Sequence, residues 1–344
     1  MNRTEKGQEM LWNRRTVVAA GAAGVALAGC VTVRAAAPIA AADSDPAYAK
    51  TNSRPPPFHR TPEERFANLA GFPFAPRYAF VDGLRVHYLD EGRGDRGTLL
   101  LLHGEPTWSF LYRNLIPTFV AAGYRIIAPD MIGFGRSDKA TQESWYTLDA
   151  HVRVLGQLID QLALRDIILV CQDWGGPYGL INAAERPHLI ARLVILNTWL
   201  HHDKYHYTDA LRAWNQRAPS VDFSQLGELP FLGGPDSAEV VRAGYRAPFE
   251  GPATQAGARR WPWMLPFANP VEGGAQRQAK AYAALSKWPK PAHVIFGDRD
   301  KVFNVEWARA FADHIPGSTF DTVPAGHMVQ ELGVPLAQLI LRRI

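Results

Sequence analysis

The residues of this chain that could do chemistry together begin with an aspartate at a tight turn. Asp173 lies in Gln172-Asp173-Trp174-Gly175-Gly176, after the apolar run 166–170 and before a predicted helix at 175–185. Small residues on both sides, Cys171 and Gly175, would let strand and helix pass closely, so the side chain at the tip stands clear of the sheet. A carboxylate there needs no base to become nucleophilic, and it suits attack at saturated carbon better than attack at an ester carbonyl.

Two further side chains follow in the order nucleophile, acid, base. His327 lies after the last predicted strand, and Asp300 lies just past the preceding strand. Attack by Asp173 on carbon would leave an alkyl ester, which water must hydrolyse with His327 as general base. Asp300 would hold the tautomer of the imidazole and stabilise the imidazolium. Asp298 is the alternative acid, and we favour Asp300 because it lies further into the loop after the strand.

A second turn offers backbone donors for the oxyanion that forms during ester hydrolysis. His103-Gly104-Glu105-Pro106 follows the third predicted strand, so the N–H groups of Glu105 and Trp174 are the predicted oxyanion hole. The Glu105 side chain would then be a carboxyl group beside an anionic site, where burial and charge could raise its pKa. Cys171 is predicted to be only the small residue that the turn needs, because it points away from the tip.

The elements that position these residues alternate between strand and helix, with one long interruption. Predicted strands lie at 78–81, 84–89, 98–102, 125–128, 166–170, 193–196, 292–296 and 318–322, and predicted helices at 110–122, 145–164, 175–185 and 328–344. Residues 199–285 are rich in Trp, Tyr, Pro and Gly and show no such alternation. We therefore predict an α/β fold with a mainly parallel eight-stranded sheet, a core at 61–198 and 286–344, and an inserted helical cap at 199–285.

The composition suits one large α/β domain with an insertion and argues against several other classes. Of the 344 residues, 47% are hydrophobic, which is enough to bury a sizeable core. The net charge is +4 and the pI about 9.1, but no dense block of Lys and Arg occurs in the body, so we expect no nucleic-acid partner. The two cysteines, Cys30 and Cys171, argue against a disulfide framework or a cysteine-based metal site.

Residues 1–42 have the pattern of an export signal. The twin arginines Arg14-Arg15 precede an apolar run that is too short for an ordinary membrane span. Leu27-Ala28-Gly29-Cys30 resembles a bacterial lipobox, which would make Cys30 the lipidated first residue of the mature chain, and a rival cleavage site lies at 35–42. Residues 43–60 are polar and proline-rich, as in a linker or an extended arm. We expect twin-arginine export to the periplasm, with Cys30 as a candidate lipid anchor.

From Thr61 to the C-terminus the sequence resembles the haloalkane dehalogenases of the α/β-hydrolase superfamily. The motifs that carry the resemblance are His103-Gly104-Glu105-Pro106-Thr107-Trp108-Ser109, Gly133-Phe134-Gly135-Arg136-Ser137-Asp138, Gln172-Asp173-Trp174-Gly175-Gly176 and Gly326-His327. The glutamate after His-Gly, with the acid in the Gly297 loop, resembles the subfamily whose acid follows the seventh core strand. The resemblance implies the two-step mechanism above, which converts a haloalkane and water to a primary alcohol and halide without a cofactor.

A departing halide would need hydrogen-bond donors, because it is a concentrated anion in a dry pocket. An indole N–H donates and cannot accept, and its ring keeps the pocket apolar. Trp174, beside the nucleophile, is placed for this role, and the resemblance implies a second tryptophan from the cap. We match that residue to Trp214, with Trp199, Trp261 and Trp263 as alternatives.

Other functions stay open at this point. An epoxide hydrolase would share the Asp-Trp-Gly-Gly turn but would need a pair of cap tyrosines, for which the chain offers Tyr205, Tyr207, Tyr245 and Tyr282. A fluoroacetate-type dehalogenase would have arginine after the nucleophile, where this chain has Trp174. The alternative from a different class is a non-catalytic exported binding protein of the same fold. We favour the hypothesis that the protein is a haloalkane dehalogenase. We expect it to be a monomer that binds a small haloalkane and water.

Overall fold

The computed structural model describes residues 55–228 and 239–344. The predicted export signal, Cys30 and the first part of the predicted linker lie outside the described residues. Contacts divide the chain into two units, 1–44 and 45–344, and all described residues belong to the second unit. Within the described ranges, no helix is long and apolar enough to span a bilayer.

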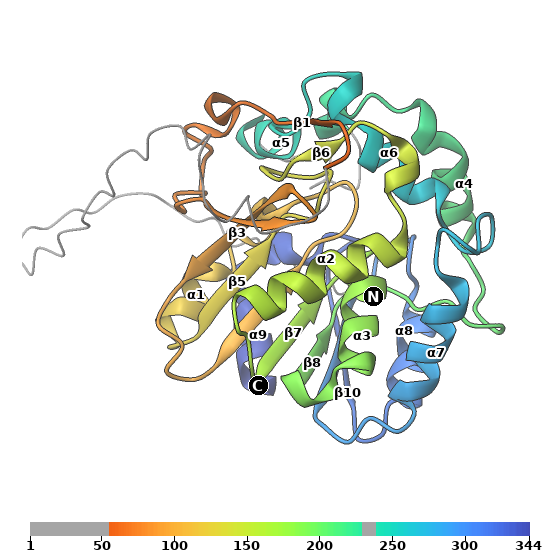
Figure 1. Ribbon diagram of the computed structural model, residues 1–344. Helices are drawn as coiled ribbons and strands as arrows, with labels where there is room; N and C mark the ends of the chain where they lie inside the picture. Colours follow the sequence, from red (N-terminus) through yellow and green to blue (C-terminus); the bar gives the residue numbers. More distant parts are fainter. Residues whose placement is uncertain (1–54, 229–238) are drawn as a thin grey trace, which may run out of the picture. The chain divides into compact units, whose positions relative to one another are not determined.

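An eight-stranded sheet lies at the centre of the fold (Figure 1). Its order is β10-β9-β8-β7-β4-β5-β3-β2, and all neighbours are parallel except for β2–β3 and β3–β5. The strands are β2 (Arg77–Val81), β3 (Leu84–Glu91), β4 (Thr98–Leu102), β5 (Arg125–Pro129), β7 (Ile167–Cys171), β8 (Ile190–Ile195), β9 (Ala292–Gly297) and β10 (Thr319–Val323). The predicted mainly parallel, eight-stranded sheet is therefore confirmed.

Helices cover the two faces of the sheet (Figure 1). On one side α2 (Leu148–Gln161) packs against α3 (Gly175–Glu185), and on the other α1 (Ile116–Ala121) packs against α9 (Val334–Arg343). α8 (Val305–His314) packs against β9 and β10. Because both faces are covered, the central strands β4 and β7 are buried over nearly their whole length. Their carboxyl ends carry the turns on which the candidate site is built.

Three predicted helices are shorter in the structure than the periodicity indicated. The helix expected at 110–122 is a 3₁₀ turn followed by α1, because the ring of Pro117 would clash with the Arg113 carbonyl in a continuous helix. The helix expected at 145–164 begins at Leu148, where the Thr147 hydroxyl accepts a bond from the Ala150 N–H (3.1 Å). The helix expected at 328–344 is divided at Gly333, whose φ of 63° breaks the helical path.

The inserted segment supplies three helices near the active-site end of the sheet, α4 (Asp209–Arg217), α5 (Glu239–Arg246) and α6 (Ala256–Trp263). α7 (Ala275–Leu285), at the end of the predicted cap, lies instead beside α3. Arg277 of α7 forms ion pairs with Glu185 (2.7 Å) and Asp149 (2.8 Å) of the core. The structure therefore places this helix in the layer that flanks the sheet.

The described end of the predicted linker is part of the folded body. β1 (Phe58–His59) pairs antiparallel with β6 (Lys139–Ala140). The next residue, Arg60, contacts both oxygens of the buried Asp138 through Nε (2.7 Å) and Nη2 (2.9 Å). The Thr61 hydroxyl donates to the Pro248 carbonyl of the inserted segment (2.9 Å). Residues 58–60 therefore fit an extended arm rather than a linker, because they have partners on the core.

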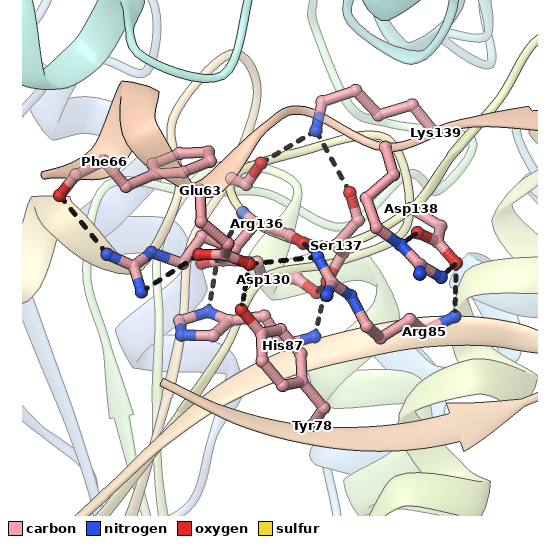
Figure 2. A network of polar contacts seen from close by, with 12 residues as sticks. Glu63, Phe66, Tyr78, Arg85, His87, Asp130, Arg136, Ser137, Asp138 and Lys139 are labelled. Atoms are coloured by element: carbon pink, nitrogen blue, oxygen red, sulfur yellow. Dashed lines mark hydrogen bonds and ion pairs between the residues drawn. The ribbon is translucent and has the colours of Figure 1, made fainter. Parts of the chain in front are cut away.

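A buried polar network fixes the loops at the carboxyl end of β5 (Figure 2). Asp130 accepts bonds from the backbone N–H groups of Ser109 (2.8 Å) and Arg136 (2.8 Å), and its other partner is His87 Nδ1 (2.7 Å). Burial by itself raises the pKa of Asp130, but the charge and hydrogen bond of His87 outweigh it and lower that pKa to about 2. A Cβ at Gly135 would lie 2.0 Å from an Asp130 oxygen, so the loop needs glycine there. The network holds the segment that follows Glu105.

Candidate active site

Asp173 stands at a strained turn between β7 and α3. Its φ is 51°, and its side chain is nearly buried. A Cβ at Gly176 would lie 1.9 Å from Thr198 Oγ1, and one at Gly104 would lie 2.2 Å from Asp173 Oδ1. The Asp173 N–H donates to the Asn197 carbonyl (2.7 Å). Neighbouring atoms thus approach the turn from several sides and hold Asp173 in a backbone conformation that a non-glycine residue rarely adopts.

The structure brings the predicted histidine and acid to Asp173, the predicted nucleophile. His327 Nε2 lies 3.6 Å from Asp173 Oδ2, and His327 Nδ1 lies 2.9 Å from Asp300 Oδ2. Asp298, the alternative acid, is about half exposed and pairs with Arg299 instead. The geometry therefore favours Asp300 as the partner of His327.

Asn197 is a site residue that the sequence did not reveal. Its Nδ2 donates to Asp300 Oδ2 (2.6 Å), and its Oδ1 accepts from the Gly297 N–H (3.0 Å). The second oxygen of Asp300 accepts from the Val302 N–H (2.7 Å). These donors fix the carboxylate that orients His327. The signal in the sequence was the position of Asn197 just after β8, where the strand–helix alternation stops.

His327 lies between the carboxylates of Asp173 and Asp300, and their charges raise the pKa of its imidazole. Burial by itself lowers the pKa of His327, but the charges and hydrogen bonds of Asp300 and Asp173 outweigh it and raise that pKa to about 10. The imidazole is thus an imidazolium at neutral pH while Asp173 is ionised. Esterification would remove the charge of Asp173, and the pKa of His327 would then fall. The geometry is therefore compatible with the predicted roles, in which His327 acts as a base only after Asp173 has reacted.

One of the two predicted oxyanion donors contacts the nucleophile directly. The Glu105 N–H donates to Asp173 Oδ1 (2.8 Å). Cys171, by contrast, is fully buried with Sγ 3.9 Å from the Val194 carbonyl oxygen, and burial raises the pKa of its thiol. The thiol is therefore unsuited to nucleophilic attack. The role of the Trp174 N–H stays a prediction.

Asp173 opens into a cavity of about 490 Å³ between core and cap. Its lining includes the side chains of Trp174, Trp214, Leu211, Leu265 and Pro262, with Glu105, Asp300 and His327. The other tryptophans that we considered do not line it. Trp199 and Trp261 lie behind Trp174, with ring centroids at 4.9 and 5.1 Å. Trp174 and Trp214 are therefore the pair that the structure presents to a ligand.

The indole of Trp214 already has an acceptor. Its Nε1 donates to Glu105 Oε2 at 2.9 Å. Burial, and then the charge of Asp173, raise the pKa of Glu105 well above its ordinary value. For Trp174 the described residues provide no hydrogen-bond acceptor at the indole nitrogen. One donor is therefore free for a ligand, and the other is shared with a buried acid.

Three cations, which the sequence did not single out, line the solvent side of the cavity. Arg217, Arg299 and Lys301 are exposed, whereas the acids that share the lining are buried. Arg217 lies over the Trp214 ring (5.6 Å), and no described carboxylate pairs with Arg217 or Lys301. We call these residues the cationic rim. Within the described ranges, no cluster of His, Cys, Asp or Glu could hold a metal ion.

The four tyrosines that an epoxide hydrolase could use do not line the cavity. Tyr245 donates to Glu331, while Tyr205 and Tyr207 pack against each other at 4.6 Å. Tyr282 stacks on His314 at 3.7 Å. The described residues therefore offer no tyrosine to protonate an alkoxide in this site.

Comparisons with known proteins agree with the geometry. Residues 97–334 match the family model of the alpha/beta hydrolase fold. The chain is 41% identical over 292 residues to a haloalkane dehalogenase of Mycobacterium marinum, which covers 82% of this chain and 98% of that protein. It is 40% identical over 296 residues to a haloalkane dehalogenase of Psychrobacter cryohalolentis, covering 83% of this chain and 97% of that one.

Solved structures give the same result. The haloalkane dehalogenase of Paraglaciecola agarilytica superposes with a TM-score of 0.77 at 34% identity, covering 84% of this chain and 99% of that chain. That of Bradyrhizobium elkani superposes with a TM-score of 0.69 at 28% identity, covering 78% and 98%. The Paraglaciecola structure is described as tetrameric, which does not fit our expectation of a monomer.

Proposed function

Because the chain belongs to the haloalkane dehalogenases, a family of α/β hydrolases, we propose that Asp173, His327 and Asp300 carry out hydrolytic dehalogenation in the cavity between core and cap. The observation that supports this most is the contact chain from Asp173 through His327 to Asp300 at a cavity lined by two tryptophans. The substrates are a haloalkane and water, and the products are an alcohol and halide. None of the side chains named needs a cofactor for these steps.

In the first step a carboxylate oxygen of Asp173 attacks the carbon that bears the halogen. The new C–O bond forms as the C–X bond breaks, and the halide leaves with the bonding electrons. The Trp174 and Trp214 indole N–H groups donate to the departing anion in a site from which apolar side chains exclude water. Asp173 is held by the Glu105 N–H on one oxygen, so the other is the attacking atom.

In the second step water attacks the carbonyl carbon of the ester. His327, which gives its proton to solvent once Asp173 has been alkylated, takes the proton from this water at Nε2, and Asp300 stabilises the imidazolium that forms. The Glu105 N–H, already at Asp173 Oδ1, donates to the oxyanion of the tetrahedral intermediate. Collapse of the intermediate breaks the bond between the carbonyl carbon and the alkyl oxygen, and the leaving oxygen takes a proton from the His327 imidazolium to give the alcohol. The new carboxyl group of Asp173 then passes its proton to His327, which restores the carboxylate and the imidazolium.

The test traps the intermediate on the protein. We expect His327→Gln to accumulate an alkyl group on the peptide that contains Asp173, seen by mass spectrometry after incubation with a bromoalkane. Asp173→Asn should carry no alkyl group, and Asp298→Asn, which changes an exposed neighbour of Asp300, should turn over normally. Normal steady turnover by His327→Gln would contradict the mechanism.

An epoxide hydrolase with the same nucleophile is the nearest competing function. It needs a donor for the epoxide oxygen, and the cavity lining contains no described tyrosine. Measuring halide from a bromoalkane and diol from the corresponding epoxide separates the two functions. Diol formation at a higher kcat/KM than halide release would overturn our assignment.

We also propose export of this enzyme, which rests on the sequence alone. The support is Arg14-Arg15 before a short apolar run, with Cys30 in a lipobox-like segment. Replacing both arginines by lysine should leave the protein in the cytoplasm, whereas Cys30→Ser should block lipidation but leave the arginine-dependent step intact. Continued export of the twin-lysine variant would contradict the route.

A further inference from the structure

A side-chain hydrogen bond joins Glu105, on the turn after β4, to Trp214 of α4, and both residues line the cavity. The acceptor is Oε2 of a carboxyl group that is only 4% exposed, on the loop after β4. The donor is the indole N–H that we assign to halide. The bond therefore directs this N–H toward Glu105, and a halide must compete with Glu105 for it.

The surroundings of Glu105 disfavour a negative charge on its carboxyl group. Asp173 lies beside it, since its Oδ1 accepts from the N–H of Glu105 itself (2.8 Å). Glu105 Oε1 is shielded from solvent and has no hydrogen-bond partner among the described residues. An ionised Glu105 would thus carry both the desolvation of an unpaired oxygen and the repulsion of a second carboxylate. A protonated carboxyl avoids the charge repulsion and most of the desolvation.

Other charged groups near the cavity do not reverse this balance. His327 faces the site from the loop after β10, but both of its ring nitrogens lie toward carboxylates, those of Asp173 and Asp300. Arg217, on α4, is exposed on the solvent side of the lining. The described residues provide no cation that pairs with Glu105. Burial and the charge of Asp173 raise the pKa of Glu105, and they outweigh the hydrogen bond from Trp214 and the charge of His327, which lower it.

We propose that Glu105 works as a neutral carboxylic acid that positions Trp214 for the halide, and that its ionisation in alkaline solution withdraws Trp214 from halide binding. The neutral carbonyl oxygen is a modest acceptor, so an arriving halide can share or take the indole N–H. An ionised carboxylate would hold that N–H about twice as strongly and would also repel the halide. Glu105 is thus a positioning residue, and this inference rests on the proposed dehalogenase function.

The test uses Glu105→Gln, which has the shape of the neutral acid and cannot ionise. We would measure bromide affinity by quenching of tryptophan fluorescence, and kcat and KM for a bromoalkane, from neutral to alkaline pH. Glu105→Gln should bind bromide within a few-fold of wild type at neutral pH and should lose less affinity as the pH rises. Asp298→Asn, which removes an exposed carboxylate outside the cavity lining, should keep the wild-type pH profile.

Two results would overturn the proposal in a variant whose thermal unfolding shows that it is folded. One is an alkaline profile of Glu105→Gln that coincides with wild type. The other is loss of bromide binding at neutral pH, which would mean that the ionised carboxylate is the working form. The double variant Glu105→Gln with Trp214→Phe separates positioning from a general charge effect, since Glu105→Gln should change bromide affinity less when Trp214 is absent. A wild-type enzyme that releases no halide from any bromoalkane would instead refute the proposed function.

Discussion

The pKa of His327 should fall when Asp173 loses its charge, and Asp173→Asn makes that change permanent. The amide matches the alkyl ester in being neutral at the same position. The two charges in wild type lie 3.6 Å apart. At an effective dielectric constant of about 20, their interaction amounts to roughly 4–5 kcal/mol, or about 3 pKa units. Since the wild-type pKa is about 10, that of the variant should lie near 7, where a general base works best.

The shift can be measured by NMR titration of the imidazole. The His327 signal is identified among the 11 histidines of the chain by its absence in His327→Gln. In Asp173→Asn the titration midpoint of His327 should move down by about 2 pH units or more, which is two thirds of the shift of about 3 units expected from the charge interaction. In Asp298→Asn the midpoint should not move. A midpoint in Asp173→Asn within a unit of wild type would refute the idea that alkylation of Asp173 switches His327 from acid to base.

Four further outcomes follow from the same contacts. Trp214→Phe should weaken bromide binding by roughly tenfold or more, because a hydrogen bond to an ion contributes about 1.5–3 kcal/mol, and unchanged fluorescence quenching would remove Trp214 from this role. Gly176→Ala should lower the melting temperature, since its Cβ would lie 1.9 Å from Thr198 Oγ1, with a loss of about 1–3 kcal/mol; a melting temperature equal to wild type would contradict the contact. The pKa of His327 in the folded state is above its unfolded value of about 6.5, so the contribution of His327 to stability is full below pH 6.5 and is lost as the pH rises through about 10. Urea unfolding measured across this window should show the loss, and His327→Gln should remove this pH dependence. Neutralising Arg217 and Lys301 to Gln should slow bromide association at low salt, and a difference that persists in high salt would exclude charge steering by the cationic rim.

Much of the site was predictable because its residues follow strands. Asp173 and Asp300 each come after an apolar run that predicts a buried strand, whereas His327 follows the more polar strand Thr319–Val323. Parallel strands bring their carboxyl ends to one edge of the sheet. Asn197 obeys the same rule, but an asparagine after a strand has no chemical signature of its own. Its role appears only when β8 is seen to lie beside both β7 and β9.

The parts that could not be predicted depend on contacts between distant segments. The bond from Trp214 to Glu105 joins residues 109 positions apart, and nothing local in either segment indicates it. The pairing of Phe58–His59 with Lys139–Ala140 likewise overrides a polar, proline-rich pattern that is typical of a linker. α8 was missed, although the Asn304 side chain caps it by accepting from the Trp307 N–H (2.8 Å), because a lone asparagine after a loop is a weak signal.

With the charge states inferred for the site, the net charge of the buried groups does not change during the first step. With Asp173 and Asp300 ionised, His327 protonated and Glu105 neutral, the buried groups carry one net negative charge before the substrate reacts. Alkylation neutralises Asp173 and creates one halide ion, so the total charge is unchanged and the negative charge only moves from the carboxylate toward the indoles of Trp174 and Trp214. An ionised Glu105 would make the halide the second uncompensated anion in a dry cavity, at a cost of several kcal/mol. On the proposal above, a neutral Glu105 therefore lowers the cost of holding a halide in this site, and the pH profile of Glu105→Gln tests it.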